Sequence, residues 1–306
     1  MRIACHITAY LDSSALACVL ESIHTQDIQP DWVRVVDNSP VRLVLPSSTL
    51  VIKQDHQPTN IGTAGAINRS IYQSHRDGVD YLWILDQDSV PNPTLLSNLI
   101  KVHQSLSSTS IQPVGIIAPL TLNRDDGQPN VPMHFDRYRA RAVPYGVEPV
   151  QCDFLPASGM LLHLPSLAAV VPPSDRYFLD GYDFALGLAV RAAGATVWLA
   201  PSLQLSHQVG SKVTFLHKGH AYSFADMPVF RVKLLHRNIT FLFIRAARGR
   251  YKLAAAAWQF RRACLQAARY LNFPFDKRWS KVSATVLGFT LGLFCLPPPR
   301  TASHPS

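Results

Sequence analysis

The chain has 306 residues, of which 47% are hydrophobic and 16% are charged, and its formal net charge is +9. This length and hydrophobic fraction exclude a disordered chain and favour one large α/β domain with an appendage. Five widely spaced cysteines without a Cys-x-x-Cys pair argue against a disulfide scaffold or a zinc ribbon, and they favour a reducing compartment.

The first half of the sequence alternates short apolar segments with helical segments. Five segments have the composition of strands: Arg2–Thr8, Trp32–Val36, Leu50–Lys53, Tyr81–Leu85 and Gly115–Leu120. Between them, Ser13 or Ser14 and Thr63 are predicted to cap helices, Asn92-Pro93 is predicted to start another, and Gly78 marks one helix end. This β-α-β-α-β order predicts an α/β fold with a doubly wound, mostly parallel sheet.

The second half is less regular. Residues 123–150 are polar and contain prolines, which indicates an excursion or a hairpin, and Phe154–Leu164 is apolar around Ser158-Gly159. A turn and a helix over Tyr177–Ala193 precede a strand at Thr196–Ala200. We therefore expect a main domain at residues 1–230 and a basic helical region at residues 231–306.

Polar residues gather at the ends of the predicted strands. Asp37 follows one strand, Asp86 and Asp88 follow another, and Asn60 and Gly62 precede a helix. In doubly wound sheets, ligands bind beyond the carboxyl ends of the strands. This placement predicts a nucleotide-binding half at residues 1–122 and an acceptor half at residues 123–230.

The segment Asp86-Gln87-Asp88-Ser89 offers two carboxylates, one residue apart, directly after a strand of buried type. Mg²⁺ and Mn²⁺ prefer hard oxygen ligands, and they often bridge one or two carboxylates to substrate phosphates. Such a cation neutralises a diphosphate leaving group as charge builds on it. The pair by itself is weak evidence, because a solvated loop can have the same spacing.

The segment Asn60–Asn68 opens a helix with small residues, which lets a phosphate approach the backbone. Close packing of a helix on the sheet explains the same residues equally well. The segment is neither a Rossmann fingerprint nor a P-loop. Asp37-Asn38 could hydrogen-bond a pyrimidine base or a ribose, and an Asx turn is the alternative.

Two acids and one histidine of the second half are further candidates. Asp180 and Asp183 lie three residues apart and would share a face of a helix. Either acid could deprotonate an acceptor hydroxyl, or it could simply favour a helix dipole. His207 could bind a metal or a diphosphate, although a lone histidine is more often structural.

Taken together and in order, these segments resemble inverting GT-A glycosyltransferases of the family 2 type, and most closely the bacterial rhamnosyltransferases of cell-surface polysaccharide synthesis. The resemblance covers roughly residues 1–245. The motifs that carry it are Val35–Ser39, Asn60–Asn68, Trp83–Ser89, Ser158-Gly159, Phe178–Asp183 and His207–Gly210. The Asp-Gln-Asp-Ser form is fairly specific to the rhamnosyltransferase-like branch.

The resemblance implies a role for each matching residue. Asp37 would contact the pyrimidine, Asp86 the ribose or the metal, and Asp88 the metal. His207 would help to hold the metal and the diphosphate, and Asp183 would be the catalytic base. Further contacts with the nucleotide sugar would come from Thr8, Asn38, Asn60, Gly62, Gln87, Ser158 and Gly159.

The implied reaction transfers L-rhamnose from dTDP-L-rhamnose, with Mg²⁺ or Mn²⁺ and with inversion, to a saccharide on a lipid carrier. The expected setting is the synthesis of lipopolysaccharide or another cell-wall polysaccharide. One departure from the branch is Ala185, which stands where a second acid is usual, so Asp180 is a substitute candidate for the base. The alternatives are another donor (UDP-galactofuranose, UDP-glucose or UDP-galactose) and a catalytically weakened scaffold of a polysaccharide assembly complex.

The last quarter of the chain concentrates positive charge. The segment Arg231–Lys281 has thirteen Lys and Arg and one acid, a net charge of +12, which leaves about −3 for the rest. Its arginines alternate with aromatic and aliphatic residues, as in amphipathic helices that lie on anionic bilayers. The apolar stretch Val282–Leu296 is shorter than the ~20 residues that span a bilayer, and the N-terminus lacks a signal-peptide pattern. We expect a cytoplasmic protein that is peripheral on the inner membrane and has no specific nucleic-acid partner.

Overall fold

The computed structural model describes residues 1–207, 211–217 and 219–294. The chain divides into two compact units, which we describe separately. The first comprises Met1–His134, Arg141–Phe178 and Tyr182–Val209, and the second comprises Phe135–Ala140, Leu179–Gly181 and Gly210–Ser306. The predicted functional division, with a main domain at residues 1–230 and a basic region at 231–306, stays a prediction.

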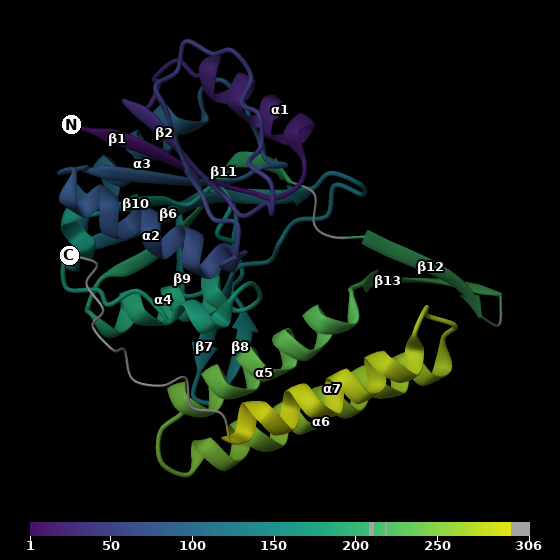
Figure 1. Ribbon diagram of the computed structural model, residues 1–306. Coiled ribbons are helices and arrows are strands. Elements are labelled where there is room, and N and C mark those ends of the chain that lie inside the picture. The colour runs from purple at the N-terminus through teal and green to yellow at the C-terminus, as the bar shows by residue number, and fades with distance from the viewer. Residues whose placement is uncertain (208–210, 218, 295–306) are drawn as a thin grey trace. The chain divides into compact units, whose positions relative to one another are not determined.

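The first unit is built on a nine-stranded sheet with the order β3-β2-β1-β4-β10-β6-β11-β5, in which β9 also pairs with β11 (Figure 1). The strands are β1 (Ile3–Ala9), β2 (Trp32–Asp37), β3 (Ile52–His56), β4 (Tyr81–Asp86), β5 (Val90–Pro91), β6 (Val114–Asn123), β9 (Val150–Cys152), β10 (Leu161–His163) and β11 (Thr196–His207). The pairs β1–β2, β1–β4, β2–β3 and β6–β11 are parallel, whereas β10 is antiparallel to both of its neighbours. The predicted doubly wound, mostly parallel α/β sheet is therefore confirmed.

The helices of the first unit follow its strands in the expected order. They are α1 (Ser13–His24), α2 (Gly62–Arg76), α3 (Leu95–Thr109) and α4 (Tyr182–Ala192), with short 3₁₀ turns at Pro165–Leu167 and Asp175–Tyr177. Gly78 follows the end of α2 with φ +67°, as its role as a stop signal predicts.

Both predictions of helix-capping side chains were wrong, and α3 begins at Leu95 rather than at Asn92-Pro93. The side chain that caps α1 is not that of Ser13 or Ser14 but that of Asp12, whose Oδ1 accepts the N–H of Ala15 at 2.9 Å. A carboxylate at this position also favours the helix dipole. Thr63 does not cap α2, because that helix already begins at Gly62 and has no side-chain cap.

The central strands are buried along nearly their whole length. In β1 six of the seven residues are buried, and β4 is buried from Tyr81 to Leu85. Continuous burial of this kind is expected for strands whose two faces are both covered by helices. Trp83 is fully buried within the core cluster that also includes residues of α1 and α3. This packed core fixes the ends of β1 and β4, where the predicted site residues begin.

Residues 123–150 form the hairpin predicted as one of two possibilities. Its strands are β7 (Met133–Asp136) and β8 (Arg139–Ala142), which pair with each other, and Met133 also forms an isolated bridge with Phe154. The strand predicted at Thr196–Ala200 is longer in the structure, because β11 continues past an irregularity between Ala200 and Gln204 to His207. That extension carries β11 to the edge of the sheet where Asp86 lies.

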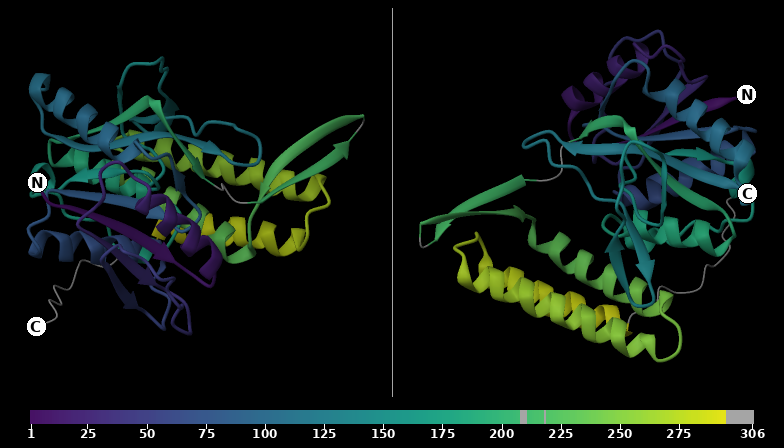
Figure 2. Two further views of the ribbon diagram at one scale, coloured as in Figure 1. Left: turned by 90° about the horizontal axis from the view of Figure 1, so that it is seen from above. Right: turned by 180° about the vertical axis from the view of Figure 1, so that it is seen from behind.

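The second unit contains the hairpin of β12 (Ser211–His217) and β13 (His220–Asp226) and three helices, α5 (Val229–Ala246), α6 (Tyr251–Asn272) and α7 (Arg278–Phe294). Figure 2 shows the hairpin as a long ribbon that projects from the helices in both views. Glycines bring α7 against α5: a Cβ at Gly288 would lie 2.5 Å from the Lys233 carbonyl oxygen, and one at Gly292 would lie 2.6 Å from that of Arg237. Among the described residues, no helix is long and apolar enough to cross a membrane. The basic amphipathic C-terminal helices are as predicted.

A buried histidine on β1 makes the stability of the first unit sensitive to acid. His6 is fully buried, with Nδ1 at 2.7 Å from the Ser70 hydroxyl and Nε2 at 2.9 Å from the Thr8 hydroxyl. Burial, assisted by the charge of Arg34, lowers the pKa of His6 from 6.5 to about 3. Between these two pH values the unfolded chain binds a proton that the native chain does not, so the free energy of unfolding falls as the pH falls.

We expect His6→Gln to make the free energy of unfolding depend less steeply on pH below pH 6.5, by on the order of 1 kcal/mol per pH unit. The measurement is a series of urea unfolding curves from pH 7 downward, and the result is the slope rather than the absolute stability. His24→Gln, at the exposed end of α1, is the matched control and should keep the slope of the parent protein. Equal slopes for His6→Gln and the parent would contradict the prediction.

Candidate functional site

Asp86, Asp88 and His207 come together at one edge of the sheet in the first unit. Asp86 ends β4, Asp88 lies two residues later, and His207 ends β11. The Asp88 Oδ1 atom lies 3.1 Å from His207 Nδ1, and the Asp86 Oδ2 atom lies 3.6 Å from His207 Nε2. One ligand atom from each of the three side chains lies within 4.8 Å of the others. The structure thus assembles the three residues that the sequence analysis assigned to the metal.

Strand pairing explains how a histidine so distant in sequence reaches the two aspartates. The two residues of β5, Val90 and Pro91, follow the aspartate loop directly and pair antiparallel with Ser206 and Leu205 of β11. The backbone hydrogen bonds of the sheet therefore hold the loop after β4 beside the end of β11. Sequence reasoning missed β5, because two residues that include a proline give no strand signal.

Burial and charge give this cluster its electrostatic character. Burial, reinforced by the charge of Asp88, raises the pKa of Asp86, while His207 acts in the opposite direction. Burial alone would lower the pKa of His207, but the two carboxylates outweigh it and the pKa of His207 is raised. Each side chain keeps 15–33% of its surface exposed, so a ligand in solution can reach it.

The ligand atoms of Asp86, Asp88 and His207 suit a divalent cation. His207 Nδ1 is buried and, within the described part of the chain, has no well-formed hydrogen bond, although Asp88 Oδ1 lies 3.1 Å from it. An unpartnered buried nitrogen beside two carboxylates costs free energy that a cation would recover. Two carboxylate oxygens and an imidazole nitrogen suit Mn²⁺, and carboxylates with water suit Mg²⁺.

The hydroxyls of two serines hydrogen-bond to the backbone of Asp86. The hydroxyls of Ser89 and Ser158 lie 2.5 Å apart, and both accept the backbone N–H of Asp86, at 3.2 and 3.3 Å. Gly159 adopts φ +90° and donates its N–H to the Ile84 carbonyl at 2.7 Å. Ser158 and Gly159, which were predicted to contact the nucleotide sugar, hold the β4 end in this structure, and a direct contact with the sugar stays a prediction. Ser89 belongs to the predicted Asp86–Ser89 motif, and its hydroxyl meets that of Ser158 across 69 residues of sequence.

Arg124 is a site residue that sequence reasoning missed. Its backbone N–H donates to the His207 carbonyl at 3.0 Å, and its guanidinium donates to the Asp88 carbonyl at 2.5 Å. One residue therefore links the two chain segments that carry the cluster. Its charge also acts to lower the pKa of His207. The only sequence signal was its place directly after the β6 segment.

We expect Arg124→Ala to weaken the binding of Mn²⁺ in the presence of nucleoside diphosphate by about tenfold, because the Asp88 carbonyl loses the guanidinium that holds it, although the backbone contact with His207 remains. Arg124→Lys should recover part of the loss, since an ammonium can still donate to the Asp88 carbonyl but lacks the planar, rigid geometry of the guanidinium. Titration calorimetry measures the dissociation constant. Arg76→Ala, at the exposed end of α2, should bind as the parent does, and unchanged affinity in Arg124→Ala would show that the contact is dispensable.

The polar residues at the end of β2 hydrogen-bond mainly to backbone groups. The Asp37 carboxylate is fully buried and accepts the N–H groups of Ser39 at 3.0 Å and Leu43 at 2.7 Å. Asn38 is also buried, and its amide bonds to Ile61 and Gly62. The Asx turn given as the alternative for Asp37-Asn38 is therefore present, and contact of either residue with a pyrimidine stays a prediction.

The other predicted nucleotide-sugar residues also make local contacts. Thr8 bonds to the buried His6, and the Gln87 side chain bonds to both backbone groups of Tyr10. Asn60 Oδ1 accepts the Gly62 N–H at 2.7 Å. Gly62 has φ +71°, and a Cβ there would lie 2.1 Å from the Phe178 carbonyl oxygen, which already accepts the Ala64 N–H at 3.1 Å. The close approach that Gly62 permits is thus to the Phe178 segment, and a phosphate contact is not tested.

The two candidate bases occupy different surroundings. Within the second unit, both Asp180 carboxylate oxygens are held by Arg231, with Nη2 at 2.7 Å from Oδ1 and Nε at 3.2 Å from Oδ2. Within the first unit, Asp183 is half-buried in the first turn of α4. The expectation that the two acids share a helix face is wrong, because α4 begins at Tyr182 after Gly181, which has φ +85°.

The comparisons with known proteins agree with this architecture. No family model matches the sequence. The galactofuranosyltransferase GlfT1 of Mycolicibacterium smegmatis is 29% identical over 117 residues, so that the match spans 37% of this chain and 37% of GlfT1. Residues 1–349 of S. aureus TarS superpose with a TM-score of 0.54 in the complex with UDP (13% identity, 93% of this chain and 81% of that one).

The same part of TarS in complex with UDP-GlcNAc also superposes with a TM-score of 0.54, at 12% identity, over 94% of this chain and 82% of that one. GalNAc-T7 with UDP, GalNAc and Mn²⁺ superposes with a TM-score of 0.51, at 11% identity, over 71% of this chain and 44% of that one. These likenesses show the fold. The chain has the GT-A fold of the nucleotide-sugar glycosyltransferases, as the sequence predicts, and a special closeness to the rhamnosyltransferases stays a prediction.

Proposed function

We propose that this chain is a metal-dependent, inverting glycosyltransferase that transfers L-rhamnose from dTDP-L-rhamnose to a saccharide or lipid-linked acceptor in cell-surface polysaccharide synthesis. The observation that supports it most is the cluster of Asp86, Asp88 and His207 at the carboxyl ends of β4 and β11 in a GT-A sheet. This is the edge at which ligands of doubly wound sheets bind.

The residues would divide the reaction between them. Asp88, Asp86 and His207 would hold Mg²⁺ or Mn²⁺, which supplies counter-charge to the departing diphosphate. Ser89, Ser158 and Arg124 would keep these ligands in place. Asp183 would accept the proton of the acceptor hydroxyl as its oxygen attacks the anomeric carbon, and the bond from that carbon to the diphosphate oxygen would break on the opposite face.

A different donor is the second candidate. The partial likeness to a galactofuranosyltransferase favours UDP-galactofuranose among the alternatives, and the UDP complexes of the structural neighbours are compatible with UDP-glucose and UDP-galactose. With either a dTDP or a UDP donor, Asp37 and Asn38 would lie beside the nucleotide base.

The experiment that tests this function is a panel of nucleotide sugars incubated with purified protein and Mn²⁺, Mg²⁺ or EDTA. Released nucleoside diphosphate and transferred sugar are measured by mass spectrometry. We expect metal-dependent, slow hydrolysis of one donor and faster turnover with a saccharide acceptor. Binding without turnover of any donor would favour the catalytically weakened scaffold that Ala185 suggests, and no binding at all would contradict the proposal.

A lipid-linked acceptor would place the reaction at a membrane surface. We propose that the protein is cytoplasmic and peripheral on the inner membrane, held there by its basic C-terminal helices. The net charge of +12 over Arg231–Lys281 supports this contact, since the cytoplasmic leaflet is anionic.

A further inference from the structure

Helix α7 presents an outward face made of apolar and hydroxyl side chains. Trp279, Val286, Leu287, Leu293 and Phe294 expose 38–77% of their surface. They lie at intervals of seven, eight, fourteen and fifteen residues from Trp279, which places them on one side of the helix. The exposed positions between them are hydroxyls, and the opposite side packs on α5 through Gly288 and Gly292.

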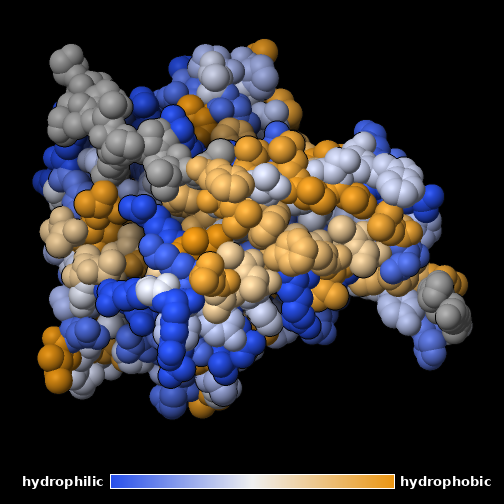
Figure 3. Space-filling model, turned by 90° about the horizontal axis from the view of Figure 1, so that it is seen from below, coloured by the Kyte–Doolittle hydropathy of each residue, from blue (hydrophilic) through white to orange (hydrophobic). Residues whose placement is uncertain are grey.

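Helix α6 continues this surface. Phe260 is 57% exposed, and its ring lies 5.6 Å from that of Phe289 on α7. Leu253, two turns before Phe260, is 79% exposed. Figure 3 shows these helices as a continuous band of hydrophobic side chains, bordered by hydrophilic ones. We call this band of α6 and α7 the apolar face. Contiguous apolar surface of this kind marks an interaction site rather than scattered exposure.

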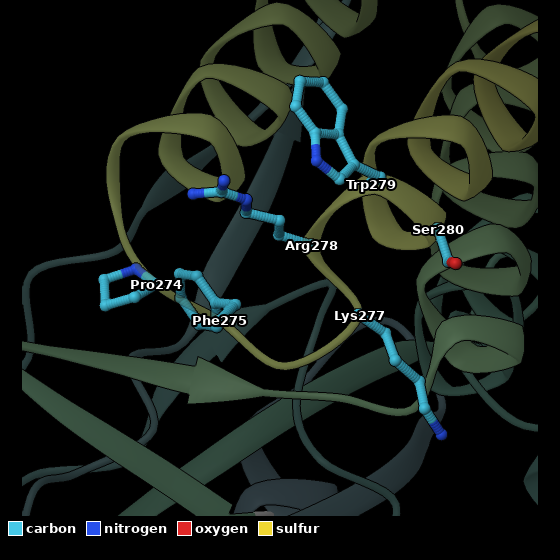
Figure 4. A pocket seen from close by; sticks show the side chains of 6 residues that line it. All are labelled: Pro274, Phe275, Lys277, Arg278, Trp279 and Ser280. Carbon is cyan, nitrogen blue, oxygen red and sulfur yellow. The ribbon is translucent and has the colours of Figure 1, made fainter.

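Cations border the apolar face. Arg261 and Arg262 follow Phe260 on α6, and both are exposed. At the start of α7 a shallow hollow of about 400 Å³ is lined by Pro274, Phe275, Lys277, Arg278, Trp279 and Ser280 (Figure 4). The Arg278 guanidinium lies 5.6 Å from the Trp279 ring. A tryptophan beside an arginine at the end of an apolar stripe is the arrangement found at the boundary between lipid headgroups and acyl chains.

We propose that the apolar face lies on an anionic lipid bilayer, with Val286, Leu287 and Phe294 at the acyl boundary and with Lys277 and Arg278 on lipid phosphates. The inference deepens the membrane contact proposed above and rests on it. A second copy of the chain is a poorer occupant, because two segments of +12 would repel each other. A nucleic acid would meet a face whose centre carries no cation among its described residues.

The test is co-sedimentation of the full chain with phosphatidylcholine vesicles, with and without phosphatidylglycerol, at low and high salt. We expect binding to the anionic vesicles and a partial release by salt. The variant Val286→Ser/Leu287→Ser should reduce the partition coefficient at least about tenfold, because apolar side chains leave the acyl boundary. Lys277→Glu/Arg278→Glu should remove the preference for phosphatidylglycerol.

The control is Ile111→Ser, which removes a fully exposed apolar side chain from the first unit and should bind vesicles as the parent does. Circular dichroism and thermal unfolding confirm that each variant is folded. Equal partitioning of the Val286→Ser/Leu287→Ser variant and the parent, or equal binding to both vesicle types, would overturn the inference. Donor hydrolysis is measured separately without lipid, so loss of the proposed activity and loss of membrane binding are distinguishable.

Discussion

Replacement of Asp88 by Asn is expected to lower metal-supported turnover of the nucleotide-sugar donor by about a thousandfold. The amide keeps the size of the side chain but removes the charge that lies 3.1 Å from His207. The cation would then be held by Asp86 and His207 alone, and the charge that develops on the diphosphate would be poorly balanced. Steady-state assays at saturating Mn²⁺, with nucleoside diphosphate release as the signal, measure the effect.

Asp77→Asn is the matched control for Asp88→Asn. Asp77 lies at the end of α2, where its carboxylate bridges Arg34 and Lys53, so its removal should leave turnover unchanged. Raised Mn²⁺ should recover little of the activity of Asp88→Asn if the charge acts on the leaving group. Full recovery would assign Asp88 to metal affinity alone. Under the scaffold alternative, Asp88→Ala would leave polysaccharide assembly intact in the source organism.

Replacement of Asp183 by Asn is expected to lower sugar transfer by a factor of about a hundred to ten thousand and to leave donor affinity unchanged. The physical reason is that an amide cannot accept the proton of the acceptor hydroxyl. The measurement pairs kcat for transfer with the dissociation constant of the donor. Transfer at the parent rate would exclude Asp183 as the base.

Asp180→Asn separates the two candidate acids. Because Arg231 occupies both oxygens of Asp180, that carboxylate has little capacity left for an additional proton. We expect Asp180→Asn to destabilise the second unit, where the pair lies, by about 1–3 kcal/mol, and thermal unfolding measures this. The opposite pattern, with a transfer defect in Asp180→Asn and none in Asp183→Asn, would make Asp180 the base despite its ion pair.

The course of the chain could be predicted from the sequence wherever local signals agreed. Short β-branched segments separated by capped helices gave the parallel sheet, and the position of Asp86 and Asp88 after β4 indicated the ligand-binding edge. The extension of β11 to His207 was not predictable, because its second half contains polar residues and pairs only through partners 80 or more residues away. The identity of the α1 cap failed for a smaller reason, since Asp and Ser compete on nearly equal terms at that position.

The candidate site was predicted as a set of residue types but not as an assembly. Arg124 and Ser158 act through contacts with backbone groups that lie 36 to 83 residues away in the sequence, and the Ser89 hydroxyl meets the Ser158 hydroxyl across 69 residues. No spacing rule reports such contacts. Asp37 illustrates the converse. Its place at a strand end allowed two interpretations, a contact with the nucleotide or an Asx turn. In the structure its carboxylate accepts the N–H groups of Ser39 and Leu43.

The two-residue strand β5 has a consequence for the choice of ion. It ties the loop of Asp86 and Asp88 to β11 before any cation arrives, so loading the site demands little ordering of the chain. The selectivity between metal ions then depends on the chemistry of the three fixed ligand atoms. A rigid site of one imidazole nitrogen and two carboxylates favours Mn²⁺, which accepts a nitrogen ligand. It disfavours Mg²⁺, which prefers oxygen ligands and gives up its water reluctantly. We expect the protein to prefer Mn²⁺ to Mg²⁺ at equal concentration.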